Sequence, residues 1–221
     1  MIPDTIEERP VTTVGEEAFQ GYDLVSVTFP DTLQTIESDA FKECTNLKSV
    51  EIPEGVTEIY GAFDGCKELT SVTLPDTLTI LGSAAFYKCS SLTDIKVPNG
   101  LSKLGNAAFS GCSSLKSIEI PKGLSKLEDD IFSDCTSLES IVIPDNIESI
   151  GKGVFGGCEN LKSVTMSEKL LQNEKDDFIH HLSDEDRRLA MRVGYVNCGI
   201  FSNCPNVSIN GTPISEFDTE N

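Results

Sequence analysis

The sequence predicts a solenoid of stacked coils with short parallel strands, and three observations predict it. Phenylalanines recur along most of the 221 residues at intervals of 22 or 23, as Phe19, Phe41, Phe63, Phe86, Phe109, Phe132 and Phe155. Prolines recur at the same interval, as Pro30, Pro53, Pro75, Pro98, Pro121 and Pro144. The prolines and phenylalanines belong to a longer pattern, which repeats in seven copies over residues 11–166: L-x-S-[VI]-x-[IL]-P-x-x-[LVI]-x-x-[IL]-x-x-x-A-F-x-x-C. One such unit cannot bury its apolar face alone, so neighbouring copies must stack.

Each copy contains the residues of one short strand followed by a return segment. In one copy, Val50 and Ile52 alternate with polar residues and are predicted to point inward from a strand. Pro53 ends that strand, because proline has no N–H to donate to a strand ladder. Val56 and Ile59 then form a second apolar pair on the return path, and the Ala-Phe pair fills the interior from the outer turn.

Six cysteines occupy one position of the repeat and are therefore expected to form a column: Cys44, Cys66, Cys89, Cys112, Cys135 and Cys158. Coils about 5 Å apart would bring their Cα atoms within disulfide range. Stacked side chains with parallel Cβ vectors are poorly aimed for bridging, however, so we expect buried free thiols. Cys198 and Cys204 lie outside this column in the sequence and could pair with each other.

The repeat pattern fails at Ser167 and returns briefly at Ile200-Phe201-Ser-Asn-Cys204. The intervening segment contains Ser183-Asp-Glu-Asp186, which resembles a helix capping box. We expect it to be helical and to cover the end of the array, whereas the start of the chain has no comparable cap. The predicted organisation is a divergent N-terminal edge (1–10), seven repeats (11–166), a helical insertion or cap (167–198), a degenerate last repeat (199–211) and a tail (212–221).

Composition excludes several classes of function. The chain carries 36 acidic against 17 basic residues, a formal net charge of −19, which disfavours nucleic acid as a partner. Its longest uninterrupted apolar run, residues 84–87, is too short to insert into a membrane. The first residues show no basic region followed by an apolar stretch, so no signal peptide is expected in this sequence.

Motifs for catalysis or cofactor binding are weak. Gly151, Gly153 and Gly156 match a dinucleotide-binding fingerprint by letter, but they lie in the register of the repeat and not between a strand and a helix. His180 and His181 lie near Asp177, an arrangement that could hold a divalent ion but more simply forms a solvated helix face. We therefore expect no catalytic residue, no cofactor and no metal.

The repeat pattern resembles the BspA-like class of leucine-rich repeats. It departs from the common leucine-rich repeat because the expected asparagine ladder is absent: the corresponding positions hold Thr32, Gly55, Thr77, Gly100, Gly123 and Asn146. The resemblance implies an α/β repeat solenoid, a curved right-handed superhelix with a short-stranded parallel sheet on its concave face. It also implies a secreted or cell-surface protein, mostly bacterial, used in adhesion or partner binding. It carries no catalytic residues.

In that architecture the outward strand residues would line the concave face, the usual binding surface. The candidate partner-binding residues are Ser49, Glu51, Ser71, Thr73, Asp94, Lys96, Ser117, Glu119, Ser140 and Val142. One column is nearly uniform serine and the other varies in chemistry, and neither holds an aromatic residue. We expect a non-enzymatic interaction or adhesion module that binds a protein or other macromolecule at a cell surface. The alternative is a structural spacer that projects another domain; the oligomeric state is left open.

Overall fold

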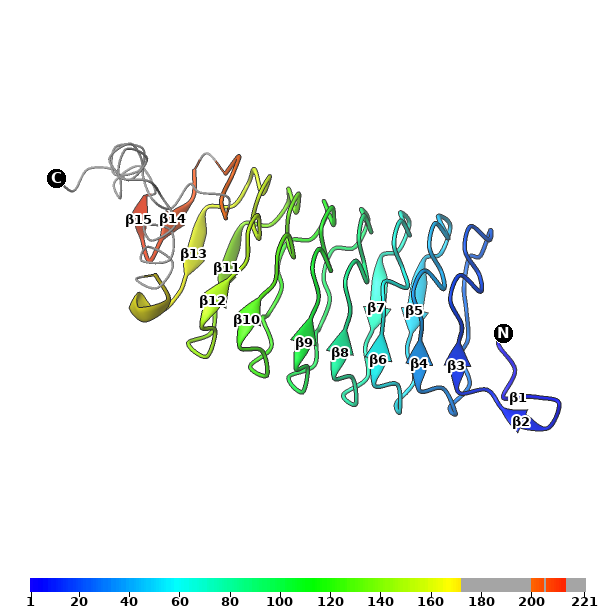
Figure 1. The fold of residues 1–221 in the computed structure, drawn as a ribbon. Coiled ribbons are helices and arrows are strands. Elements are labelled where there is room, and N and C mark those ends of the chain that lie inside the picture. The colour runs from blue at the N-terminus through cyan, green and yellow to red at the C-terminus, as the bar shows by residue number, and fades with distance from the viewer. Residues whose placement is uncertain (172–199, 205, 214–221) are drawn as a thin grey trace, which may run out of the picture.

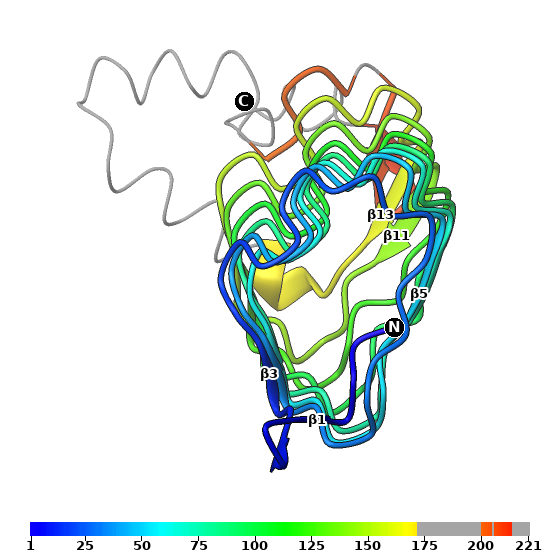
Figure 2. The ribbon, with the colours of Figure 1, turned by 90° about the vertical axis from the view of Figure 1, so that its right-hand side faces the viewer.

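A computed structural model describes residues 1–171, 200–204 and 206–213, and in it the chain winds into a solenoid along a single axis (Figure 1). Seen down that axis, successive coils superpose closely (Figure 2). Each coil passes through a strand segment, a proline turn at its narrow edge, a return segment and an outer turn that carries the repeated phenylalanine. The predicted parallel-stranded solenoid is confirmed.

The return segments form the longer of two stacks of strands. A five-stranded parallel sheet contains, in order, β3 (Thr13–Val14), β4 (Thr35–Ile36), β6 (Glu58–Ile59), β8 (Ile80–Leu81) and β9 (Lys103–Leu104). A separate parallel pair, β10 (Lys126–Leu127) and β12 (Ser149–Ile150), follows in the next coils. The sequence predicted only an apolar pair on this path. The structure adds two hydrogen-bonded ladders, in each of which successive return segments pair in register, with a break between β9 and β10.

The predicted strands form the second stack, which is interrupted. β5 (Ser49–Glu51) pairs with β7 (Ser71–Thr73), and β11 (Ser140–Val142) pairs with β13 (Ser163–Thr165), each in parallel. β14 (Ser208–Ile209) extends the second group in parallel and β15 (Thr212–Pro213) closes it antiparallel. In the two intervening coils, residues 94–96 and 117–119 are not in strands. The single sheet expected on one face is therefore two short sheets with a gap.

A continuous column of phenylalanine rings fills the interior at the outer turn. From Phe19 to Phe155, consecutive ring centroids lie 5.2 to 6.0 Å apart, with interplanar angles of 10° or less. Phe201 stacks directly on Phe155 at 5.5 Å. The six rings from Phe41 to Phe155 are fully buried. The periodic phenylalanines are thus the axis around which the coils align.

The backbone turns into the left-handed region on both sides of each stacked phenylalanine from Phe19 to Phe155. The residue two before the ring has positive φ in Glu17, Asp39, Gly61, Ala84, Ala107, Asp130 and Gly153. The residue two after it has positive φ in Gly21, Glu43, Gly65, Lys88, Gly111, Asp134 and Gly157. The peptide groups between them bond to the next coil: Phe63 N–H donates to the Ala85 carbonyl at 2.9 Å, and Gly65 N–H to the Tyr87 carbonyl at 2.8 Å. The outer turns therefore hydrogen-bond along the axis, as strands do.

The N-terminal end is partly covered, contrary to the expectation that it has no cap. β1 (Thr5–Ile6) and β2 (Arg9–Pro10) form an antiparallel hairpin beside the first coil. Before the hairpin, the chain crosses the open end, where the Ile2 N–H donates to the Thr28 carbonyl at 2.9 Å and the Ile2 side chain packs on the core. Residues 1–10 thus make a small, incomplete cap.

At the other end, residues 168–171 form a helical turn. Ser167 caps it, since its Oγ accepts a hydrogen bond from the Leu170 N–H at 3.2 Å. The remainder of the predicted insertion and most of the predicted tail lie outside the described residues. In the part of the chain that the structure describes, no helical segment has the length and apolar character needed to cross a bilayer.

Candidate functional site

The ten residues predicted to bind a partner are all exposed. They alternate with buried residues, Val50, Val72, Ile95, Ile118 and Ile141, which point into the core. The parallel register places Ser49 beside Ser71 and Glu51 beside Thr73. We call this set of ten residues the strand face. It presents two columns of side chains along five consecutive coils, a distance of about 20 Å at the usual spacing between strands.

The second column of the strand face is chemically varied. Glu51, Thr73, Lys96, Glu119 and Val142 follow one another from coil to coil. Val142 is 65% exposed and adds an apolar side chain to the column. Neither Lys96 nor Glu119 makes an ion pair within the described residues. Both charges are therefore free to meet a partner. The first column, Ser49, Ser71, Asp94, Ser117 and Ser140, offers mainly small hydroxyl groups.

The cysteine column is structural. Each thiol donates to the carbonyl of the phenylalanine in the preceding coil, with sulfur–oxygen distances of 2.9 to 3.3 Å. All its members are free and buried, which confirms the expectation of unbridged thiols. Cys204, expected outside the column, belongs to it: its thiol donates to the Phe155 carbonyl at 2.9 Å. That expectation was wrong because Phe201 stacks on Phe155 and Cys204 bonds to the same coil, although Phe155 and Phe201 are 46 positions apart in the sequence. Cys198 lies outside the described residues.

Burial makes these thiols poor nucleophiles. Desolvation raises the pKa of Cys112 to about 12 and that of Cys204 to about 11, although a hydrogen bond to the backbone partly opposes it. Desolvation likewise raises the pKa of Cys89 and Cys135 well above the ordinary value. A thiol needs access and a low pKa to react, and these have neither. Burial and the raised pKa values therefore favour a packing role for the column.

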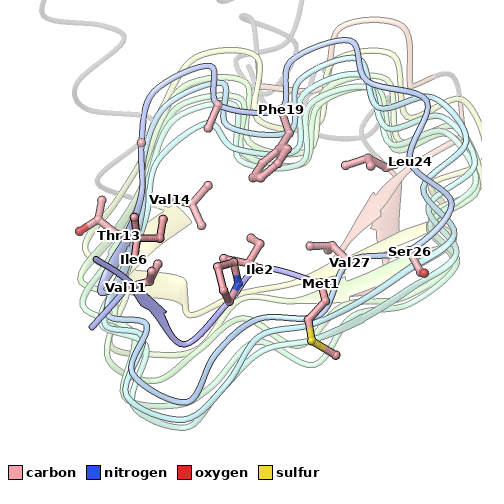
Figure 3. Close-up of a pocket in the computed structure, with 13 residues that line it drawn as sticks. Met1, Ile2, Ile6, Val11, Thr13, Val14, Phe19, Leu24, Ser26 and Val27 are labelled. Carbon is pink, nitrogen blue, oxygen red and sulfur yellow. The ribbon is translucent and has the colours of Figure 1, made fainter. Parts of the chain in front are cut away.

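An apolar cavity of about 390 Å³ lies at the N-terminal end, between the crossing segment and the first coil (Figure 3). Figure 3 shows Ile2 projecting into the opening, with Phe19, Leu24 and Val27 around it. Phe19 stacks on Phe41 of the next coil and lines this cavity together with residues 1–3. The cavity was not predictable from the sequence, since it depends on the position of residues 1–3, which carry no repeat signal.

The other candidate motifs gain no support as sites. Gly153 has a φ of 63° at the left-handed position before Phe155, so the letter match to a dinucleotide fingerprint is repeat chemistry. His180, His181 and Asp177 lie outside the described residues. Among the residues that are described, no group of three or more histidine, cysteine, aspartate or glutamate side chains is arranged to hold a metal ion.

Comparison with known proteins decides the family. The family model for the BspA type leucine-rich repeat region matches residues 12–138 and 79–208, with six copies. This chain belongs to the BspA-type leucine-rich repeat family. The structure is also similar to the crystal structure of a Treponema pallidum (T. pallidum) leucine-rich repeat protein, with 34% identity and a TM-score of 0.68 over 78% of this chain and 79% of that one.

Two further solved leucine-rich repeat proteins support the fold. A leucine-rich repeat protein from Bacteroides ovatus is 26% identical, with a TM-score of 0.58 over 76% of this chain and 57% of that chain. One from Eubacterium ventriosum is 21% identical, with a TM-score of 0.55 over 69% and 51% of the respective chains. No curated protein matches the sequence. The comparisons therefore establish a leucine-rich repeat solenoid and name no ligand.

Proposed function

We propose that this BspA-type repeat protein is a non-enzymatic interaction module that binds a protein partner through the strand face. One observation carries the proposal. Five consecutive coils present exposed side chains of different chemistry in one column, and Lys96 and Glu119 in that column have no ion-pair partner within the described residues. A mixed strip of polar, basic, acidic and apolar groups suits a protein surface better than a uniform polyanion.

The absence of a reactive centre among the described residues supports a binding role. The potential nucleophiles of the cysteine column are buried, with raised pKa values. A catalytic site needs convergent titratable groups beside a cavity, whereas the N-terminal cavity is lined by apolar side chains, two hydroxyls and a glycine. The resemblance to BspA-like repeats supports a secreted or cell-surface location, and adhesion is the binding role that fits it.

A structural spacer is the second candidate. The nearly uniform serine column and the lack of aromatic side chains on the strand face favour it, because strong binding sites are usually anchored by aromatic residues or arginine. A spacer would leave every strand-face substitution without effect on function. The two candidates therefore differ in one measurable property, the sensitivity of partner affinity to the strand face.

The test exchanges two charges without changing the net charge. A partner is first isolated with the wild-type protein from host or neighbouring-cell extracts, and its Kd is then measured with the Lys96→Glu/Glu119→Lys variant. We expect affinity to fall about tenfold, or about 1.4 kcal/mol. The control is Lys152→Glu/Glu159→Lys, which exchanges two exposed charges away from the strand face. If both variants bind as the wild type does, the partner does not use the strand face.

A further inference from the structure

The charges of the chain are unevenly distributed along the solenoid. Residues 1–80 contain sixteen acidic and four basic side chains, and residues 127–171 contain nine and three. Between them, residues 81–126 contain six lysines and only two acidic residues. The middle coils are thus positively charged in a chain whose formal charge is −19.

Three of these lysines lie together on the proline turn and the return strands of two consecutive coils. Lys103 is in β9, Lys126 occupies the same repeat position in β10, and Lys122 directly follows Pro121 in the turn. We call Lys103, Lys122 and Lys126 the lysine band. At the position of Lys122, other coils have Asp31, Glu54, Asp76, Asn99 and Asp145. The charge on this edge therefore changes sign at one coil and changes back at the next.

The lysine band is largely unneutralised. All three side chains are exposed. Lys126 pairs with Glu128 at 2.8 Å, whereas Lys103 and Lys122 make no ion pair within the described residues. Like charges at equivalent positions of neighbouring coils repel each other, so the fold gains no stability from this arrangement. An anionic ligand would relieve that repulsion.

We propose that the lysine band binds a short acidic segment of a partner protein. The band is about 10 Å wide along the axis, two coils at the usual strand spacing. Asp76 on one side and Asp145 on the other lie on the same edge. Charges are screened over about 8 Å at physiological salt. A segment that crosses the two coils meets the lysines, whereas a long polyanion running along the axis would meet acidic coils on both sides. The strand face shares no residue with this band, so the two proposals stand or fall separately.

The experiment uses a fluorescent peptide with eight consecutive glutamates and measures its Kd by anisotropy. The triple variant Lys103→Glu/Lys122→Glu/Lys126→Glu should bind at least about tenfold more weakly than the wild type, and rising salt should weaken wild-type binding. The corresponding lysine-to-glutamine variant should lose less. The matched control is Lys48→Glu/Lys67→Glu/Lys152→Glu, which changes the net charge equally at exposed lysines outside the band. It should retain most of the affinity.

Three results would overturn the proposal. One is equal weakening by both triple variants, since that would be an effect of net charge alone. Another is no binding of the peptide to the wild type at millimolar concentration. The third is tighter binding of a sulfated polysaccharide or single-stranded DNA than of the peptide, because the flanking acidic coils should reject a long polyanion. Circular dichroism checks that each variant is folded.

Discussion

In each repeat from Phe19 to Phe155, two residues adopt the left-handed backbone conformation, which strains any residue except glycine and was not predicted from the sequence pattern. The left-handed positions flank the stacked phenylalanine, and they hold glycine in some coils but alanine, lysine, aspartate or glutamate in others. An L-residue in this conformation costs about 1–2 kcal/mol relative to glycine. Non-glycine side chains persist there because the hydrogen bonds to neighbouring coils impose the turn.

Adjacent alanines in the coil of Phe109 test this strain. Ala107 has a φ of 54°, whereas Ala108 is fully buried and is absent from the residues with positive φ. Ala107→Gly should leave the free energy of unfolding unchanged or raise it by about 1 kcal/mol, because relief of strain offsets the added freedom of the unfolded chain. Ala108→Gly should lower it by about 1 kcal/mol. Urea denaturation measures both, and equal destabilisation by the two changes would contradict the account.

The sequence predicted which side chains point inward and outward, because alternation around Val50 and Ile52 is a strong signal. It did not predict the left-handed positions. A signal existed in the recurrence of glycine at Gly61 and Gly153 and at Gly65, but charged residues at the same positions in other coils obscured it. For the candidate site, the sequence predicted that its ten side chains are exposed. Which residues lack ion pairs could not be predicted, because that depends on the neighbouring coil.

The coil is the unit of stability, and two columns join one coil to the next. Stacked phenylalanines supply buried apolar contact, and the cysteine thiols bond to phenylalanine carbonyls of the preceding coil. The parallel sheets of the return segments were not predicted because their strands are two residues long, as in Thr35–Ile36, and so show no alternating pattern. Neighbouring coils share each interface, so damage to one coil should spread to both of its neighbours.

The phenylalanine column can be tested at its centre. Phe109 is fully buried, with Phe86 at 5.7 Å on one side and Phe132 at 6.0 Å on the other. Phe109→Ala should reduce the free energy of unfolding by about 3–5 kcal/mol through the cavity it leaves. Phe19→Ala is the control and should cost less, because Phe19 is partly exposed at the open end. If Phe109→Ala lowers the free energy of unfolding by less than about 1 kcal/mol in denaturant melts, the phenylalanine column does not stabilise the fold as described.

The cysteine column predicts selective protection from alkylation. Without denaturant, iodoacetamide should leave all seven thiols of the column unmodified, and in urea it should react with all of them. The seven are Cys44, Cys66, Cys89, Cys112, Cys135, Cys158 and Cys204. Mass spectrometry of the unreduced protein identifies the labelled sites. A disulfide between consecutive members such as Cys89 and Cys112 would show instead that the array is covalently stapled.

The same thiols predict how stability depends on pH. Burial raises the pKa of Cys112 from 9.0 to about 12, so the fold favours the protonated form. The stability this contributes is complete below pH 9 and is lost as the pH rises from about 9 towards 12. Urea melts should therefore show a lower free energy of unfolding at pH 10 than at pH 7, and a smaller difference for Cys112→Ala. An identical difference in the two proteins would show that Cys112 does not contribute.

The molecule as a whole is a one-dimensional array whose interior is nearly the same in every coil. The features that differ between coils lie on the surface. They are the varied column of the strand face, the change of charge at the lysine band and the apolar cavity beside Phe19. The family explains the shared interior. The outer features differ from coil to coil, and under the proposed function they are the features that would distinguish one partner from another.

Hydrogen exchange of the free protein and of its complex with an isolated partner tests the central proposal, binding through the strand face, most directly. We predict slowed exchange on binding in residues 49–51, 71–73, 94–96, 117–119 and 140–142, with the outer turns unchanged. The coils at 94–96 and 117–119, which lack a strand ladder, should show the largest change. Protection confined to the outer turns or to the N-terminal cavity, with the strand segments exchanging as in the free protein, would contradict the proposal.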